Sequence, residues 1–170
     1  MRADKLLASI IVLAAATRLS STQRSAGPVT IQILMEPERV EAFRIALPSR
    51  VDRGQLSKQR EWIGEYPVIQ SAGTSAQMDR AIEIAGSVLS AGDFSRRCVF
   101  QPGYAIRYWR GTRSVSLLFC FHCAEFRVLP RGGGGEPAFG GDFGKVSTAV
   151  VKFLRKEFPD DRDLAVLELK

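Results

Sequence analysis

The chain contains no asparagine and a single histidine among its 170 residues. Without asparagine it has no acceptor for N-linked glycosylation. With only His122, it has no second imidazole for acid–base catalysis, and its residue spacing assembles no Ser-His-Asp triad. No internal repeat and no nucleic-acid recognition motif is present in the sequence. These absences argue against a repeat array and against the enzyme classes built around histidine.

Long apolar runs are also scarce, and the one at the N-terminus has the pattern of an export signal. Arg2 and Lys5 precede an apolar run that ends in three alanines, as in a secretory signal peptide. The run is about eleven residues, short of the roughly twenty that cross a bilayer. We expect residues 1–16 to be a cleaved signal peptide and residues 17–28 to be disordered or extended. An ordinary N-terminal helix of the folded domain is the alternative.

Positive charge predominates, with 24 Lys and Arg against 18 Asp and Glu and a net charge of +6. Arginine-rich surfaces can bind phosphate or nucleic acid. An exported protein seldom meets nucleic acid, however, so we interpret the charge as a solvated basic face and expect no nucleic-acid partner. The arginines of this face in predicted strands and turns are Arg107, Arg110, Arg113, Arg127 and Arg131.

Apolar periodicity and turn signals predict a single α+β domain over residues 29–170. Strands are expected at residues 29–35, 39–47, 66–69, 104–110, 113–121 and 126–129, and helices at 75–91, 143–158 and 164–169. Clustered strands with tight turns favour an antiparallel sheet of five to six strands with two main helices packed on one face. The other face is then solvated or covered by residues 48–65.

The dipeptide Gly111-Thr112 predicts a two-residue type II′ turn between two of these strands. That turn places Tyr104 opposite Phe119, with both side chains on the core face. Cys120 then points to the opposite face of the sheet.

The same register ranks the possible disulfides. Extended past a break at residues 102–103, it brings Phe100 opposite Cys123 and leaves Cys98 one diagonal step away, on the core face. Cys98 with Cys123 is therefore the first choice. Cys120 with Cys123 is the second, because it needs a sharp turn at residues 121–122, where neither residue favours a positive φ.

The stretch Cys120-Phe121-His122-Cys123 also raises two chemical alternatives. A thioredoxin-like site requires the dithiol to open a helix, whereas a strand is expected to follow here. A Cys₃His zinc site from Cys98, Cys120, His122 and Cys123 has suitable ligands. Against it, Cys120 and His122 are expected on one side of the strand and the other two cysteines on the opposite side. We expect no cofactor.

Three motifs resemble a family of small exported bacterial proteins of uncharacterised function. They are Phe100-Gln101-Pro102-Gly103-Tyr104-Ala105-Ile106-Arg107, Val115-x-Leu117-Leu118-x-Cys120-Phe121-x-Cys123 and Phe158-Pro159-Asp160-Asp161. The resemblance covers residues 29–167. It implies that Cys98, Cys120 and Cys123 belong together, and it supplies no catalytic residue.

The sequence thus favours a periplasmic or extracellular, non-enzymatic accessory or protein-interaction domain of the bacterial envelope. We expect a protein partner, in a larger envelope complex, and no stable membrane span after signal cleavage. The alternative is a thiol-disulfide redox or zinc-binding protein that uses Cys120, His122 and Cys123.

Overall fold

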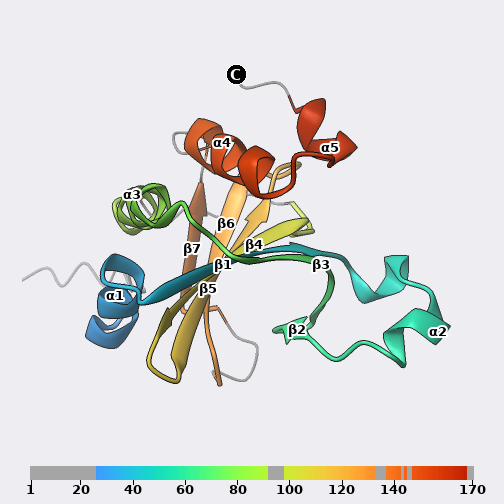
Figure 1. Ribbon diagram of the computed structural model, residues 1–170, viewed down its shortest axis with the longest axis horizontal. Helices are drawn as coiled ribbons and strands as arrows, with labels where there is room; N and C mark the ends of the chain where they lie inside the picture. Colours follow the sequence, from blue (N-terminus) through green and yellow to red (C-terminus); the bar gives the residue numbers. More distant parts are fainter. Residues whose placement is uncertain (1–25, 92–97, 133–136, 143, 145–146, 168–170) are drawn as a thin grey trace, which may run out of the picture.

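The computed structural model describes residues 26–91, 98–132, 137–142, 144 and 147–167. Seven strands form one antiparallel sheet in the order β2-β3-β1-β4-β5-β6-β7, curled into a half-barrel (Figure 1). The α+β class is confirmed, with more strands than the five to six predicted. The strands are β1 (Arg39–Ile45), β2 (Trp62–Ile63), β3 (Tyr66–Thr74), β4 (Tyr104–Arg110), β5 (Arg113–Cys120), β6 (Glu125–Pro130) and β7 (Phe139–Asp142).

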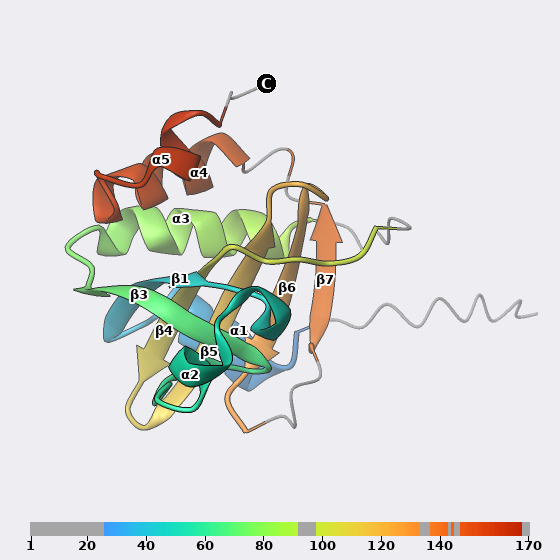
Figure 2. The same ribbon diagram turned by 90° about the vertical axis from the view of Figure 1, so that its right-hand side faces the viewer.

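Helices cover one face of the sheet, which we call the helix-covered face (Figure 2). They are α1 (Pro28–Met35), α3 (Met78–Leu89), α4 (Ser147–Glu157) and α5 (Arg162–Ala165). Alternate strand residues and the apolar stripes of the helices form the larger hydrophobic cluster there. Its fully buried large side chains include Ile84, Ile106, Tyr108, Leu117, Phe119, Phe126, Phe153 and Leu154.

A smaller cluster lies on the other face, which we call the hairpin-covered face. Residues 46–65, with the short helices η1 (Pro48–Arg50) and α2 (Arg53–Leu56), lead into a β2–β3 hairpin that packs on this side together with residues 98–101. Ile63 of the hairpin and Phe100 are both buried in this cluster. The expectation that residues 48–65 cover this face is therefore correct in part.

The prediction of a strand over residues 29–35 is wrong, because this segment is helix α1. Pro28 stands at the start of the helix, where a missing amide hydrogen is tolerated. Thr30, Ile33 and Leu34 are buried together, at a helical spacing. Short apolar runs fit a buried helix as well as a strand, so periodicity alone could not separate the two. A hairpin of residues 29–35 with the next strand, which two consecutive predicted strands would favour, is therefore also absent from the described residues.

The prediction also missed strand β7, Phe139–Asp142, which contains two glycines. At Gly140 a β-carbon would lie 2.7 Å from the carbonyl oxygen of Phe126 on the neighbouring strand. Only glycine allows this close approach of the two backbones. In the sequence these two glycines are typical of a loop, and for this reason the segment was not predicted as a strand.

All three predicted helices are present, and the two main ones, α3 and α4, are shorter than predicted. Helix α3 begins at Met78, and the Ser75 hydroxyl accepts a hydrogen bond from the Gln77 amide (3.0 Å) ahead of it. Helix α5 begins after Asp161, whose carboxylate accepts from the Asp163 and Leu164 amides. Residues 143 and 145–146 of the second predicted helix, and 168–169 of the third, lie outside the described residues.

The predicted register of β4 and β5 is confirmed. Tyr104 pairs with Phe119 and Arg110 with Arg113, and Gly111 in the turn has φ +56°. Pro67 in the predicted strand 66–69 favours an edge position, but β3 lies between β2 and β1, with Pro67 opposite Trp62.

Two expectations fall outside the described part of the chain. The signal peptide of residues 1–16 is one, and most of the segment 17–28 is the other. Near the start of the described part of the chain, Gly27 is extended and Pro28 is already helical. None of the described helices is long and apolar enough to cross a membrane.

Candidate functional site

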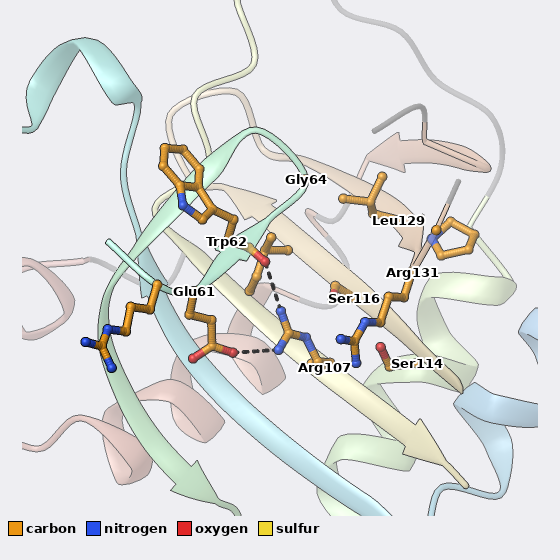
Figure 3. A pocket seen from close by; sticks show the side chains of 12 residues that line it. Glu61, Trp62, Gly64, Arg107, Ser114, Ser116, Leu129 and Arg131 are labelled. Atoms are coloured by element: carbon orange, nitrogen blue, oxygen red, sulfur yellow. Dashed lines mark hydrogen bonds and ion pairs between the residues drawn. The ribbon is translucent and has the colours of Figure 1, made fainter. Parts of the chain in front are cut away.

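A cavity of about 240 Å³ lies between the β2–β3 hairpin and strands β4, β5 and β6 (Figure 3). Three arginines, two serines and one carboxylate provide most of its polar groups. Its lining consists of Arg60, Glu61, Trp62, Ile63, Gly64, Arg107, Ser114, Ser116, Leu129, Pro130, Arg131 and Gly132. We call it the arginine cavity.

The turn of the hairpin closes over the sheet at Gly64. Its φ is +61°, and a β-carbon there would lie 2.7 Å from a methyl carbon of Leu129 on β6. Glycine satisfies both requirements, because it adopts positive φ without steric cost and leaves room for the leucine. This contact brings the hairpin from one end of the sheet onto a strand near the other end.

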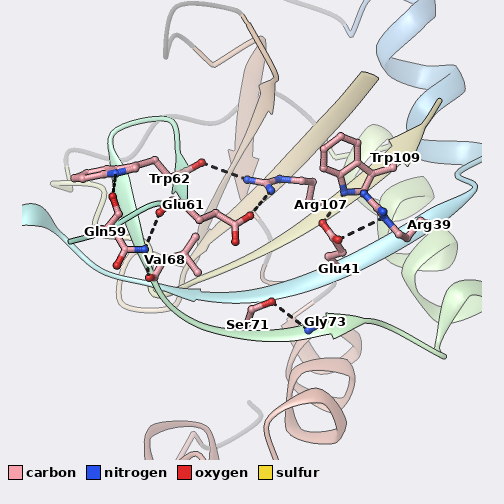
Figure 4. Close-up of polar contacts among 10 residues, drawn as sticks. All are labelled: Arg39, Glu41, Gln59, Glu61, Trp62, Val68, Ser71, Gly73, Arg107 and Trp109. Carbon is pink, nitrogen blue, oxygen red and sulfur yellow. Dashed lines mark hydrogen bonds and ion pairs between the residues drawn. The ribbon is translucent and has the colours of Figure 1, made fainter. Parts of the chain in front are cut away.

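Arg107 joins the hairpin to the middle of the sheet. Its guanidinium donates to the Glu61 carboxylate (2.7 Å) and to the Trp62 carbonyl (3.3 Å), as Figure 4 shows. It also lies over the Phe43 ring, 4.7 Å from the centroid. Only 11% of its side chain is exposed. A charge this enclosed requires its partner, so Arg107 and Glu61 together hold the hairpin in place.

The base of the hairpin is held by the side chain of Gln59 (Figure 4). Its amide nitrogen donates to the carbonyl oxygens of Glu61 (2.9 Å) and Val68 (2.6 Å). The Val68 amide in turn donates to the Glu61 carbonyl (3.1 Å). These bonds fix the position of Glu61 and Trp62 at the rim of the cavity.

The floor of the cavity is β5. Ser114 and Ser116 alternate with core residues of the helix-covered face, so both point to the cavity side. They are only 3% and 5% exposed. Neither hydroxyl has a hydrogen-bond partner among the described residues.

Arg131 forms the wall opposite Arg107. Its amide donates to the Ser114 carbonyl (2.9 Å), which sets the start of its side chain beside β5. Figure 3 shows the guanidinium groups of Arg131 and Arg107 pointing toward the same space, next to the two serines. In the described part of the chain no carboxylate pairs with Arg131, while Arg107 has Glu61.

Trp109 lies among several of the basic side chains on this face. Three guanidiniums lie near its ring, with centroid distances of 4.7 Å for Arg39, 5.1 Å for Arg131 and 5.6 Å for Arg107. The indole nitrogen donates to Glu41 (2.6 Å), which also pairs with Arg39 (Figure 4). Arg39 is thus neutralised locally, whereas Arg131 has no carboxylate partner among the residues that the structure describes.

The predicted basic residues have three different environments. Arg107 lines the cavity, Arg110 pairs with Glu36 at the far end of β4, and Arg113 is exposed at the turn. Arg127 lies over the Phe100 ring, 4.0 Å from its centroid, on the hairpin-covered face. The sequence therefore identified basic strands but not the cavity.

The cavity is completed by the two serines and Trp62, which the sequence did not indicate as a site, and by Arg131, which was predicted only as part of the basic face. One signal was available for the floor. Serines that alternate with valine and leucine along a strand predict a polar surface on one side. The contact between the hairpin and β6 depends on residues 64 and 129, and nothing in their spacing indicates it.

The three cysteines lie at the other end of β5. Cys98 and Cys123 form a disulfide with a Cα–Cα distance of 6.0 Å, so the first-ranked pair is confirmed. The predicted face is wrong for Cys98 and Cys123 and correct for Cys120. All three sulfurs belong to the hairpin-covered cluster, because a turn over residues 121–124 directs Cys123 back beside Cys120. Ala124 makes this possible with φ +50°.

Cys120 is a free, fully buried thiol. Its sulfur accepts from the Gln101 amide (3.5 Å) and from the Cys123 amide (3.4 Å). Its position is therefore that of a core residue with two weak polar contacts.

The other proposed ligands do not gather around one point. Within the described residues, no group of three or more His, Cys, Asp or Glu side chains is placed to hold a metal ion. His122 is exposed in the turn, and two of the cysteine sulfurs are bonded to each other.

A second polar cluster on the surface joins α5 to the sheet. The Tyr104 hydroxyl donates to Asp161 (2.8 Å), and Arg44 pairs with Asp161 (3.4 Å) and with Asp163. Burial first, and then the hydrogen bond to Asp161, raise the pKa of Tyr104. Each charged group here has a partner, which is the pattern of a structural contact.

Comparison with protein-family models, with curated proteins and with solved structures finds no match. The resemblance to small exported bacterial proteins stays a prediction. The function therefore has to be inferred from the chemistry of the cavity.

Proposed function

We propose that this chain is an exported, non-enzymatic binding domain that holds an acidic protein partner against the arginine cavity. The observation that carries the proposal is the direction of two guanidiniums, from Arg107 and Arg131, into a space that contains one carboxylate, Glu61. An anionic group from a partner balances this charge.

The rim of the cavity has the composition of a protein-binding surface. Trp62 is 40% exposed, and Arg60 and Arg131 are exposed beside it. Tryptophan and arginine are the residue types that most often dominate binding energy at protein interfaces. A rigid surface also lowers the entropy cost of association, and Arg107 and Gln59 hold this rim by hydrogen bonds.

Export is supported by the signal-like residues 1–16 and by the disulfide, since disulfides persist in oxidising compartments. A non-enzymatic role is supported by the position of the single histidine. His122 lies in the turn beyond the end of β5, and Ser116 is about 13 Å along the strand from that end at 3.3 Å per residue. The redox or zinc alternative remains a hypothesis based on the sequence motif alone.

Site-directed photocrosslinking in the native envelope tests the proposal. A photoreactive phenylalanine at Trp62 should give a discrete adduct whose crosslinked peptide is acidic, and Arg131→Gln should abolish that adduct. The same probe at Val29, which is 49% exposed on α1, is the matched control on the helix-covered side. Equal adducts from both positions, or a crosslinked peptide without acidic residues, would contradict the proposal.

A further inference from the structure

The floor of the arginine cavity contains hydrogen-bond donors without acceptors. Ser114 and Ser116 are each more than nine-tenths buried and line the cavity, and neither side-chain hydroxyl has a hydrogen-bond partner in the part of the chain that the structure describes. Buried hydroxyls in proteins are nearly always hydrogen-bonded. Neither serine oxygen is among the fully enclosed polar atoms that lack a partner, so both hydroxyls open onto the cavity and are available to an acceptor that enters it.

The charge beside these hydroxyls indicates that the acceptor is an anion. The Arg131 guanidinium lies next to both serines in Figure 3 and has no acidic partner among the described residues. Arg107 points into the same space from the other side. Two cations that face one another are stabilised by a negative group between them.

The donor count and the local charge favour a carboxylate over a phosphate. A guanidinium fork supplies two parallel donors and the serines supply two more, which match the roughly four acceptor positions of a carboxylate. Glu61 lines the same cavity and already pairs with Arg107. Its negative charge disfavours a phosphate dianion more than a single carboxylate.

The size and the walls of the cavity indicate what carries the carboxylate. At about 240 Å³ the cavity exceeds the volume of an ion alone. Ile63, Leu129 and Pro130 provide apolar surface around the polar floor. A carboxylate at the end of a short aliphatic chain, as in a glutamate side chain, fits both the polar floor and the apolar walls.

We propose that Ser114, Ser116 and Arg131 form a carboxylate-binding subsite that receives the end of an aliphatic acidic group. Only the source of the carboxylate, a protein partner, rests on the proposed function. The same subsite takes a free small carboxylic acid by the same contacts.

Two probes that differ only in charge test the subsite. N-acetyl-glutamate amide and N-acetyl-glutamine amide have nearly the same shape, and binding of each is followed by the amide NMR signals of residues 114, 116 and 131. Inorganic phosphate at the same ionic strength is the third probe. We expect the glutamate probe to bind at least tenfold more tightly than the other two, with shifts confined to the cavity.

Variants then assign the contacts. Ser114→Ala/Ser116→Ala and Arg131→Gln should each weaken the glutamate probe at least tenfold, while Arg113→Gln, which removes an exposed charge outside the cavity, should change its affinity less than twofold. Arg131 is exposed, so its variant keeps the fold even where the double serine variant does not. Equal binding of both acetylated probes, tighter binding of phosphate, or an equal loss in Arg113→Gln would overturn the carboxylate subsite.

The crosslink at Trp62 separates the two proposals. If the glutamate probe fails while the acidic adduct persists, the subsite is wrong and the protein partner uses the rim alone. If the glutamate probe binds while no adduct forms, the subsite is correct and its source is a small carboxylic acid.

Discussion

The two faces of the sheet are stabilised in different ways. On the helix-covered face, 22 described residues form an apolar cluster under four helices. On the hairpin-covered face, the apolar cluster has 11 described residues, and a disulfide, a two-residue strand and the Arg107–Glu61 pair complete it. The first arrangement fills its volume with side chains. The second leaves a cavity in which some polar groups have no partner among the described residues, and a binding function can be placed there at little cost to stability.

The largest effect in this comparison should come from the helix-covered core. Phe153 of α4 is fully buried, so Phe153→Ala should lower the free energy of unfolding by about 3–5 kcal/mol. Phe100→Ala on the other face should cost only about 2 kcal/mol, because the flexible Arg127 side chain, which lies over the Phe100 ring, can move into part of the space. Urea denaturation of both variants measures the difference, and equal losses would mean that the two faces are packed alike.

The second effect concerns the disulfide that holds residues 98–101 to the sheet. Cys98 and Cys123 are 25 residues apart, and Cys123→Ser should cost about 3 kcal/mol, mostly by freeing the unfolded chain. Cys120→Ser is the control and should cost about 1 kcal/mol, since the new oxygen can still accept from the two neighbouring amides.

Alkylation of the unreduced native protein checks the pairing directly. Cys120 should resist the reagent until the protein unfolds, because its thiol is fully buried. Recovery of alkylated Cys98 together with a Cys120–Cys123 bond would contradict this arrangement and favour the redox alternative.

The sequence predicted those features that depend on neighbours along the chain. The turn at Gly111-Thr112 determines the β4–β5 register, and that register places Cys120 on the side away from Phe119. The disulfide followed from the same register, although the expected face of Cys123 was wrong because Ala124 takes the positive φ that reverses the chain.

The features that sequence reasoning missed depend on contacts between distant segments. The α1 segment forms a helix rather than a strand because Ile33 and Leu34 pack against the sheet. The arginine cavity exists because Gly64 meets Leu129, 65 positions later, and this contact has no local sequence signature. Unpaired serine hydroxyls are likewise visible only once their surroundings are known.

Alanine substitutions at two glycines should have a smaller effect on stability, and they test how closely the hairpin lies on β6. Gly64 and Gly73 both have positive φ, at +61° and +77°, but only Gly64 has a neighbour within contact distance of an added β-carbon. Gly73→Ala should cost about 1 kcal/mol for the backbone alone, and Gly64→Ala about 2 kcal/mol because Leu129 must also move. Gly64→Ala should further weaken the glutamate probe, whereas Gly73→Ala should not. Equal stability losses would mean that the hairpin does not rest on Leu129.

The last comparison of the two faces uses the ionisation of their tyrosines, which has no effect on the protein at neutral pH. The chain has three tyrosines. Tyr104 and Tyr108 belong to the helix-covered core, and burial raises the pKa of each, with the hydrogen bond to Asp161 adding to the effect at Tyr104. Tyr66 belongs to the hairpin-covered cluster, where burial and then a hydrogen bond with Glu65 raise its pKa to about 12. No phenol of the folded protein should therefore ionise near the ordinary value of about 10.

The folded state holds these phenolic protons more tightly than the unfolded state does, so stability should be unchanged by pH below about 10 and should fall as pH rises from 10 toward 12. Phenolate absorbance should show Tyr66 ionising first, near pH 12, followed by the other two only as the protein unfolds. Tyr66→Phe should remove that first step and leave the unfolding step in place. If the first step instead persists in Tyr66→Phe and disappears in Tyr104→Phe, the helix-covered face is the more open of the two, and the contrast between filled and partly polar faces is reversed.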